Sequence, residues 1–269
     1  MKKLIIFSDL DETLLERHTY SFAKAKPALK LLKDKDIPLV IVTSKTVAEI
    51  EHYRKRLANK HPFVCENGGG VFIPKGYFKD LLGNKVEERE GYQVMTLGTP
   101  YAKLRSAIAE LGDEGFAIRG FGDMTPEEIM DITGLTHEEA KLSVQRSFDE
   151  PFVCDGCDTD ALKEAIRAKG LRFAEGRLFH ITGDNDKGKA VGILTELYRA
   201  KFGQVVTAAL GDSPTDVSML EAVERPIIVQ KDDGTYHPSV DVPGLVRSAG
   251  AGPEGWNRAV TELIDTLKD

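Results

Sequence analysis

The chain has 269 residues, 41% of them hydrophobic and 29% charged, and a formal net charge of −7 at pH 7. This length allows one large domain or two ordinary ones, each with a sizeable core. The acidic balance gives no global positive field that would attract nucleic acid or an anionic membrane, so we expect neither as a partner.

The first predicted element is a short strand over residues 4–7, which runs directly into Asp9 and Asp11. Carboxylates this close repel each other, so the pair needs a cation, a shared proton or full solvent exposure. The apolar run before them is shorter than the roughly 7–15 residues of a secretory signal. No later stretch reaches the ~20 apolar residues of a membrane span. We therefore expect a cytoplasmic protein.

Short apolar runs alternate with helical patterns at both ends of the chain. The N-terminal part predicts a helix, a strand, a helix and two short strands, over residues 21–36, 37–44, 45–60, 61–69 and 71–75. The C-terminal part predicts a helix, a strand, a helix, a strand and a last helix, over residues 187–203, 204–212, 213–223, 225–230 and 252–268. This alternation predicts an α/β fold whose parallel sheet is covered on both faces.

The middle of the chain has a different pattern, in which strands and helices no longer alternate regularly. Thr125 and Thr136 each begin a Thr-x-x-Glu sequence, which is typical of a capping box at a helix start. We interpret residues 84–186 as an α+β domain inserted between two parts of one core, residues 1–83 and 187–269.

The chain has three cysteines, an odd number that argues against a disulfide framework. Cys154 and Cys157 form a lone C-x-x-C near a predicted strand end. No second pair and no histidine at ligand spacing accompany them, so we interpret them as two thiols rather than as a zinc or redox site.

Polar residues follow the predicted core strands at their carboxyl ends, where open α/β sheets bind ligands. They form four groups: Asp9 with Asp11, Thr43 with Ser44, Lys187, and Asp212 with Asp216. Carboxylates, a hydroxyl and a lysine suit Mg²⁺ and a phosphoryl group, because few hard oxygen ligands leave positions open for water and phosphate. Each aspartate alone could simply cap a helix, but four groups converging on one edge favour a site.

Two other kinds of site are excluded. The loop that begins at Asp9 has Leu14 where an EF-hand needs glycine and Tyr20 where it needs glutamate. The chain also lacks the sequence G-x-x-x-x-G-K-[ST], so it has no P-loop.

These residues resemble the haloacid dehalogenase superfamily of phosphohydrolases. DLDETL, Thr43, Lys187 and GDSPTD look like its four motifs, and the insertion resembles its type-two cap. From Leu4 to about Trp256, the segments TSKT, ENGGG, RSFDEPF, RLFHITGDNDKGKAV and GPEGW resemble the mannosyl-3-phosphoglycerate phosphatases. The resemblance implies a Rossmann-like core with an inserted cap, and a Mg²⁺-dependent phosphatase of a glycosyl-3-phosphoglycerate.

The resemblance also implies roles for the acidic residues. Asp9 is the nucleophile that becomes an aspartyl-phosphate, and one of its oxygens binds Mg²⁺. Asp11 gives its backbone carbonyl to the metal, while its side chain acts first as general acid and then as general base. Asp212 is the second carboxylate ligand, and Asp216 is a ligand or supports one.

The phosphoryl group is expected to be stabilised by Mg²⁺, Lys187, the Thr43 hydroxyl and backbone N–H groups, and Ser44 is expected to bind substrate beside Thr43. Two positions depart from the family pattern. Glu12 stands where glycine is usual, and we expect its carboxylate to face solvent. Thr215 replaces the usual asparagine of the fourth motif, and its shorter reach weakens the expected support for Asp212.

Substrate contacts outside these motifs have competing structural explanations. Glu66 and Asn67 end the third core strand and could contact substrate hydroxyls, or Asn67 could simply form a turn. Arg146 in the insertion is a candidate clamp for a carboxylate, or else a surface arginine. His180 could touch the ligand or line the hinge side of the cap.

Other functions remain open at this point. A phosphatase of sucrose phosphate, glucosylglycerol phosphate or a hexose phosphate shares the core motifs, as does a phosphosugar mutase. A signalling receiver also uses an acidic cluster and a lysine, but receivers are single compact domains without such an insertion. A silent sugar-phosphate binder is not supported, because Asp9 and Asp11 are both present. The sequence does not give the oligomeric state.

Overall fold

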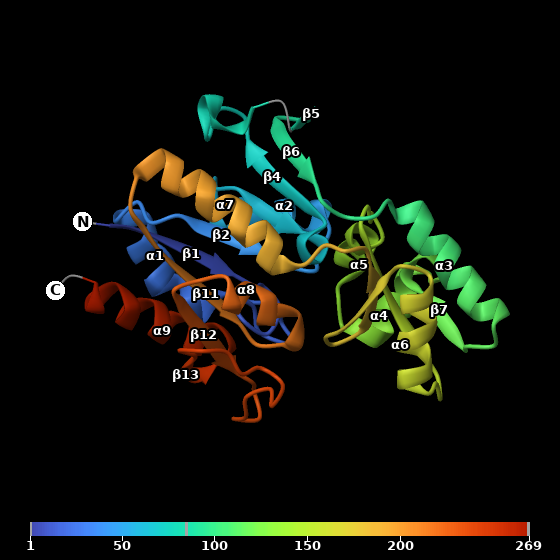
Figure 1. Ribbon diagram of the computed structural model, residues 1–269. Coiled ribbons are helices and arrows are strands. Elements are labelled where there is room, and N and C mark those ends of the chain that lie inside the picture. Colours follow the sequence, from blue (N-terminus) through green and yellow to red (C-terminus); the bar gives the residue numbers. More distant parts are fainter. Residues whose placement is uncertain (1, 84–85, 268–269) are drawn as a thin grey trace.

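The computed structural model describes residues 2–83 and 86–267. The core sheet has nine strands within this part of the chain, in the order β13-β12-β11-β1-β2-β3-β4-β6-β5 (Figure 1). Their bounds are β1 Lys3–Ser8, β2 Leu39–Val42, β3 Phe63–Cys65, β4 Gly70–Pro74, β5 Glu87–Arg89, β6 Tyr92–Thr96, β11 Val205–Gly211, β12 Arg225–Gln230 and β13 Val246–Ala251. Neighbouring strands run parallel from β13 to β3, and the last three strands continue antiparallel.

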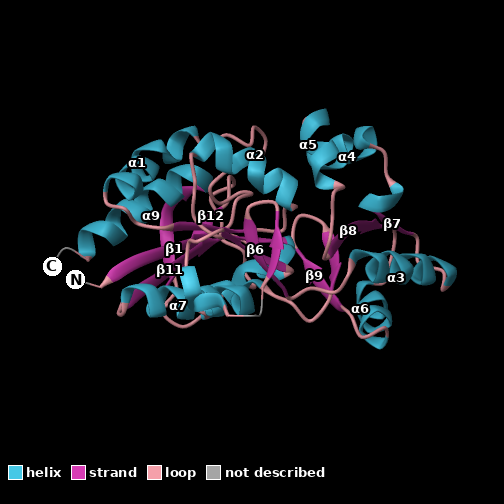
Figure 2. Ribbon diagram, turned by 90° about the horizontal axis from the view of Figure 1, so that it is seen from above, coloured by secondary structure: helices cyan, strands magenta, loops and turns pink. Residues whose placement is uncertain are grey.

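Helices cover both faces of this sheet, as the alternating pattern predicts. They are α1 Lys26–Asp34, α2 Val47–Leu57, α7 Lys187–Phe202, α8 Val217–Glu221 and α9 Gly252–Thr266. Figure 2 shows α1, α2 and α9 on one side of the strands and α7 on the other. The predicted α/β fold is confirmed.

The position of β1 at the centre of the sheet explains why its sequence is apolar without interruption. Leu4 and Ile6 pack into the hydrophobic cluster beneath α1 and α9, whereas Ile5 and Phe7 pack into the cluster beneath α7. Successive strand residues point to opposite faces, so a strand covered on both sides must be apolar at every position. Parallel pairing with β11 and β2 then brings the carboxyl ends of three strands to one edge.

The insertion forms its own small domain at that edge (Figure 1). Its antiparallel sheet has the order β7-β8-β10-β9, with bounds β7 Ile118–Gly120, β8 Asp149–Cys154, β9 Arg172–Glu175 and β10 Phe179–Thr182. The helices are α3 Tyr101–Asp113, α4 Pro126–Thr133, α5 His137–Ser143 and α6 Thr159–Ala168. Thr125 and Thr136 form the expected capping boxes with Glu128 and Glu139. We call this unit the cap.

The structure moves the first boundary of the cap. The strands β5 and β6 lie within residues 84–186, yet β6 pairs with β4 along Gly70–Pro74 and extends the core sheet. The cap therefore begins after Thr96 and not at residue 84. The signal was weak because β5 and β6 are short, and antiparallel edge strands do not follow the alternation that marks the parallel part.

The interpretation of Cys154 and Cys157 as two thiols needs correction, since the structure joins them by a disulfide. Gly156 between them adopts φ +64°, and the resulting turn brings the two Cα atoms to 5.7 Å, within the usual range for a disulfide.

Among the helices that the structure describes, none is both long and apolar enough to cross a membrane.

Candidate active site

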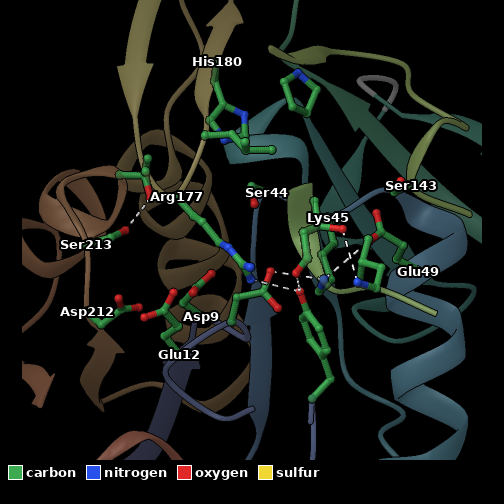
Figure 3. A pocket seen from close by; sticks show the side chains of 18 of the residues that line it. Asp9, Glu12, Ser44, Lys45, Glu49, Ser143, Arg177, His180, Asp212 and Ser213 are labelled. Atoms are coloured by element: carbon green, nitrogen blue, oxygen red, sulfur yellow. Dashed lines mark hydrogen bonds and ion pairs between the residues drawn. The ribbon is translucent and has the colours of Figure 1, made fainter. Parts of the chain in front are cut away.

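The polar groups predicted at the strand ends do meet at one edge of the core sheet. Asp9 follows β1, Ser44 follows β2, Asp212 follows β11, and Lys187 is the first residue of α7. All four line one pocket between the core and the cap. Figure 3 labels three of them, Asp9, Ser44 and Asp212. The edge forms because β11, β1 and β2 are parallel neighbours, so their chains leave the sheet side by side.

Lys187 lies at the centre of the buried charges. Its Nζ donates to Asp9 Oδ1 at 2.8 Å and to Asp216 Oδ1 at 2.6 Å, and its side chain is only 1% exposed. Burial raises the pKa of Asp9 to about 7, although the positive charge of Lys187 acts in the opposite direction. The lysine therefore favours the ionised carboxylate that a nucleophile requires.

Three buried carboxylates form a candidate metal site. Oxygens of Asp9, Asp212 and Asp216 all lie within 4.8 Å of one another. Burial raises the pKa of Asp212 well above its ordinary value, and the neighbouring carboxylates of Asp216 and Asp9 raise it further. Lys187 alone cannot neutralise three carboxylates, and this excess of negative charge together with hard oxygen donors fits Mg²⁺.

The members of this cluster are held differently. Asp212 Oδ1 accepts a hydrogen bond from the Thr13 hydroxyl at 2.9 Å. Asp216 has both oxygens engaged, because Oδ1 accepts from Lys187 while Oδ2 accepts from the backbone N–H groups of Asp212 and Ser213 at 3.1 Å. Asp216 is thus placed to orient Lys187 and the Asp212 backbone.

Asp11 is held by a basic residue that the motif reading did not single out. Lys45 Nζ lies 3.1 Å from Asp11 Oδ2 and 3.3 Å from Glu49 Oε1, and it sits over the ring of Tyr20. Asp11 Oδ1 is buried and has no hydrogen-bond partner within the described residues. An unpartnered oxygen beside the nucleophile suits a group that exchanges protons with substrate or water.

The two hydroxyl residues after β2 lie in different environments. Ser44 lines the pocket, and its backbone carbonyl accepts from Arg146. Thr43 is fully buried at the end of the strand, where its hydroxyl accepts the N–H of Lys45 at 3.4 Å. The structure therefore brings Ser44 to the pocket wall and leaves Thr43 behind it.

Glu66 joins the core to the cap. Its carboxylate is fully buried, and Oε2 accepts the backbone N–H groups of Ser147, Phe148 and Asp149 at 2.9, 2.7 and 2.9 Å. Burial raises the pKa of Glu66 to about 7, against the opposing effect of Arg146. The contacts fix the start of β8, so Glu66 is occupied in positioning the cap.

Arg146 belongs to the same junction. Its Nε donates to the Asp149 carbonyl at 2.7 Å and its Nη2 to the Ser44 carbonyl at 2.6 Å. Its guanidinium also lies 3.8 Å from the carboxylates of Glu66 and Asp149, and the side chain is 3% exposed. Arg146 reaches the pocket wall, but its donors are directed at the protein.

Asn67 and His180 meet at a buried carboxylate from the cap. Asp149 accepts from Asn67 Nδ2 at 2.6 Å and contacts His180 Nδ1 at 2.9 Å. His180 and Arg146 lower the pKa of Asp149 despite its burial. His180 also lines the pocket, whereas Asn67 does not. Glu66 and Asn67, which were predicted to contact substrate, thus bind the cap in this structure.

Comparison with known proteins identifies the family. The model of haloacid dehalogenase-like hydrolases matches residues 6–234. The chain belongs to the haloacid dehalogenase-like hydrolases. It is 48% identical to a glucosyl-3-phosphoglycerate/mannosyl-3-phosphoglycerate phosphatase of Methanococcoides burtonii, with 97% of each chain covered. It is 36% identical to a mannosyl-3-phosphoglycerate phosphatase of Pyrococcus horikoshii, covering 84% of this chain and 90% of the relative.

Solved structures of other proteins share the whole architecture. A protein of Thermoplasma acidophilum aligns with a TM-score of 0.71 at 16% identity, covering 98% of this chain and 99% of that one. The sucrose-phosphatase of Synechocystis aligns with a TM-score of 0.62 at 16% identity, covering 100% and 99%. At this identity the likeness shows the fold alone. The family match and the curated relatives confirm the resemblance that the sequence motifs indicated.

The two departures from the haloacid dehalogenase pattern now have a structural account. Glu12 adopts φ +55°, a left-handed conformation that explains why glycine is usual there. Its carboxylate lines the pocket and accepts from Arg17 at 3.0 Å, with 14% side-chain exposure, so the expectation that it faces solvent is wrong. The Thr215 hydroxyl forms a hydrogen bond with the Ser213 hydroxyl at 2.8 Å, and the hydroxyl that donates to Asp212 is that of Thr13.

Three further pocket residues of this haloacid dehalogenase-like hydrolase escaped the sequence reading: Tyr20, Lys45 and Arg177. Lys45 lies inside the TSKT segment and Arg177 begins RLFH, so each belongs to a segment that resembles the mannosyl-3-phosphoglycerate phosphatases. Residue type and spacing could not show which of the many lysines and arginines face the pocket. That choice depends on contacts between residues as far apart as Tyr20 and Arg177.

Proposed function

We propose that this chain is a Mg²⁺-dependent phosphatase that hydrolyses glucosyl- or mannosyl-3-phosphoglycerate to the glycosylglycerate and phosphate. The observation that carries the chemistry is the buried Asp9 carboxylate held by Lys187 beside Asp212, at the floor of a pocket that the cap closes. The substrate class rests on the relative from Methanococcoides burtonii, at 48% identity over 97% of both chains.

Asp9, Asp212 and the backbone of Asp11 would hold Mg²⁺, with Asp216 orienting Lys187 and the Asp212 backbone. When bound, the metal neutralises charge on the phosphoryl oxygens and on the carboxylates. Lys187 adds a fixed positive charge beside the reacting oxygen of Asp9. Ser44 and neighbouring backbone N–H groups complete the cradle for the three equatorial oxygens.

Two chemical steps follow from this arrangement. In the first, Asp9 attacks phosphorus, the bond from phosphorus to the sugar-acid oxygen breaks, and Asp11 gives that oxygen a proton. In the second, Asp11 takes a proton from water, which attacks the aspartyl-phosphate and releases phosphate with Asp9 restored. Lys45 fixes the Asp11 side chain through Oδ2, which leaves Oδ1 for the proton transfers. Dividing the hydrolysis in two lowers a very large barrier.

A phosphate-release screen tests the proposal. Purified protein with Mg²⁺ is offered mannosyl-3-phosphoglycerate, glucosyl-3-phosphoglycerate, sucrose 6-phosphate, glucosylglycerol phosphate and glucose 6-phosphate, with Asp9→Asn as the inactive control. We expect the two glycosyl-3-phosphoglycerates to give the highest kcat/KM. A higher value for any of the other esters would replace the proposed substrate class. The cytoplasmic location stays a prediction.

A further inference from the structure

Among the described residues, one arginine that lines the pocket forms no ion pair with a carboxylate. Five basic side chains line it: Arg17, Lys45, Arg146, Arg177 and Lys187. Four of them form ion pairs with carboxylates, and within residues 2–83 and 86–267 Arg177 forms none. An unpaired guanidinium in a pocket is a ready partner for an anion.

Arg177 comes from the turn between β9 and β10 in the cap. Figure 3 shows its side chain reaching from the cap toward Asp9 and Glu12 of the core. Its Nη1 donates to the Tyr20 hydroxyl at 3.2 Å, and that hydroxyl donates to the Thr133 carbonyl at 3.0 Å. Tyr20 is 7% exposed, so a buried core residue directs an otherwise exposed arginine into the pocket.

The assignment of a ligand to Arg177 rests on the proposed function, because the proposed substrate carries two anionic groups, a phosphoryl group and a carboxylate. Lys187 and the metal site match the phosphoryl group. The glycerate carboxylate lies two carbon–carbon bonds from the phosphorylated carbon, so it must stay near the mouth of the phosphate site. Lys45 and Arg17 are neutralised there by Asp11 and Glu12.

Arg146, the other arginine that the cap offers, has its donors directed at backbone carbonyls and at the junction carboxylates. Redirecting it would leave Glu66 and Asp149 buried without their guanidinium, which is costly. We propose that Arg177 binds the glycerate carboxylate and thereby selects phosphoglycerate esters over sugar phosphates that have no carboxylate. A guanidinium presents two parallel N–H donors to a carboxylate, which fixes orientation as well as charge.

Matched variants separate this role from general damage. Arg177→Ala removes the guanidinium, and Arg177→Lys keeps the charge without the planar fork. Tyr20→Phe removes only the hydroxyl that orients it. Arg172→Ala is the control, because Arg172 lies on the same hairpin, pairs with Asp184 and is outside the pocket. Melting curves of all variants establish that they are folded.

Each variant is assayed with mannosyl-3-phosphoglycerate and with p-nitrophenyl phosphate, which has no carboxylate. We expect Arg177→Ala to lower kcat/KM for the first by about 10–100-fold, the usual range for a hydrogen bond to a charged group. Activity on p-nitrophenyl phosphate should fall by a much smaller factor, because this ester has no carboxylate for the guanidinium to bind. Arg177→Lys and Tyr20→Phe should lose less, and Arg172→Ala should match the wild type.

A second measurement uses 3-phosphoglycerate and glycerol 3-phosphate as competitive inhibitors of p-nitrophenyl phosphate hydrolysis, since they differ only at the carboxylate carbon. We expect the wild type to prefer 3-phosphoglycerate and Arg177→Ala to lose that preference. Equal loss on both substrates, or a preference that survives in Arg177→Ala, would overturn the role of Arg177.

The two proposals fail in different ways. A wild type that hydrolyses sugar phosphates but no glycosyl-3-phosphoglycerate refutes the proposed function. The inhibitor pair then still decides whether Arg177 recognises a carboxylate, because it does not depend on turnover of the glycosylated substrate. A wild type that hydrolyses the glycosylated substrate with no loss in Arg177→Ala refutes the inference alone.

Discussion

Replacing Lys187 by methionine should destabilise the metal-free protein strongly. The substitution keeps an unbranched chain but removes the ammonium that lies 2.8 Å from Asp9 and 2.6 Å from Asp216. The side chains of these partners are 8% and 0% exposed, so their carboxylates would be left buried without a cation. Removing one partner of such a buried pair costs about 3–5 kcal/mol. At roughly 2–4 °C per kcal/mol for a protein of this size, Tm should fall by about 6–20 °C.

The assay is thermal unfolding at pH 7 in EDTA and in Mg²⁺, with Lys189→Met as the control. Lys189 is one helical half-turn away, is 45% exposed and pairs with Asp184, so its replacement should cost at most about 1 kcal/mol. Mg²⁺ should stabilise Lys187→Met more than the wild type, because the metal offsets charge that the lysine no longer balances. Lower pH should also narrow the difference by protonating the carboxylates.

The reasoning would be refuted by a Lys187→Met protein whose melting in EDTA matches that of Lys189→Met. It would also be refuted if Mg²⁺ raised Tm by the same amount in wild type and variant, because the charge balance would then not involve this cluster.

Four shorter predictions concern other residues. Asp9→Asn should form no phosphoenzyme in rapid-quench labelling, whereas Asp11→Asn should lose about 10²–10⁴-fold in kcat. EDTA treatment should abolish phosphate release, and added Mg²⁺ should restore it. Arg146→Ala should lower Tm and should not discriminate between mannosyl-3-phosphoglycerate and p-nitrophenyl phosphate in kcat/KM, since its contacts are structural. Burial lowers the pKa of His61 to about 4 from 6.5. The neutral imidazole therefore contributes stability that is present above pH 6.5 and is lost as pH falls toward 4. Urea titrations should show a fall in the free energy of unfolding on the order of 3 kcal/mol across this range, and His61→Phe should abolish the fall.

The sequence predicted the parts of the molecule that depend on local pattern. The apolar runs and helical periods give the parallel core, and the aspartates at strand ends give the acidic edge, because neighbouring parallel strands end together. Asp9, Asp212 and Lys187 were recognisable because the chemistry constrains residue type at known offsets. Their mutual contacts then follow from the fold.

The contacts between core and cap were beyond the reach of pattern reading. Glu66 and Ser147 are 81 positions apart, and nothing local shows that a strand-end glutamate will accept backbone N–H groups from the cap. Arg146 and Arg177 are both arginines in the cap, yet one is enclosed at the junction and the other opens to the pocket. Only the assembled fold distinguishes them. Residues 87–96 were assigned to the insertion for the same reason, because only the fold shows that β6 pairs with β4 and that β5 pairs with β6.

The way Glu66 holds the cap has a consequence for building chimeric enzymes. Its partners are main-chain N–H groups, which every residue but proline supplies, so a transplanted cap with the same backbone path through residues 147–149 can satisfy Glu66 whatever its side chains there. Asp149 is contacted by the side chains of Asn67, His180 and Arg146, so these four residues should be kept as a set. Residues 176–178, the turn that carries Arg177 between β9 and β10, precede His180 and lie outside these junction hydrogen bonds as the described residues form them, which makes this turn the segment to exchange when a new substrate preference is wanted.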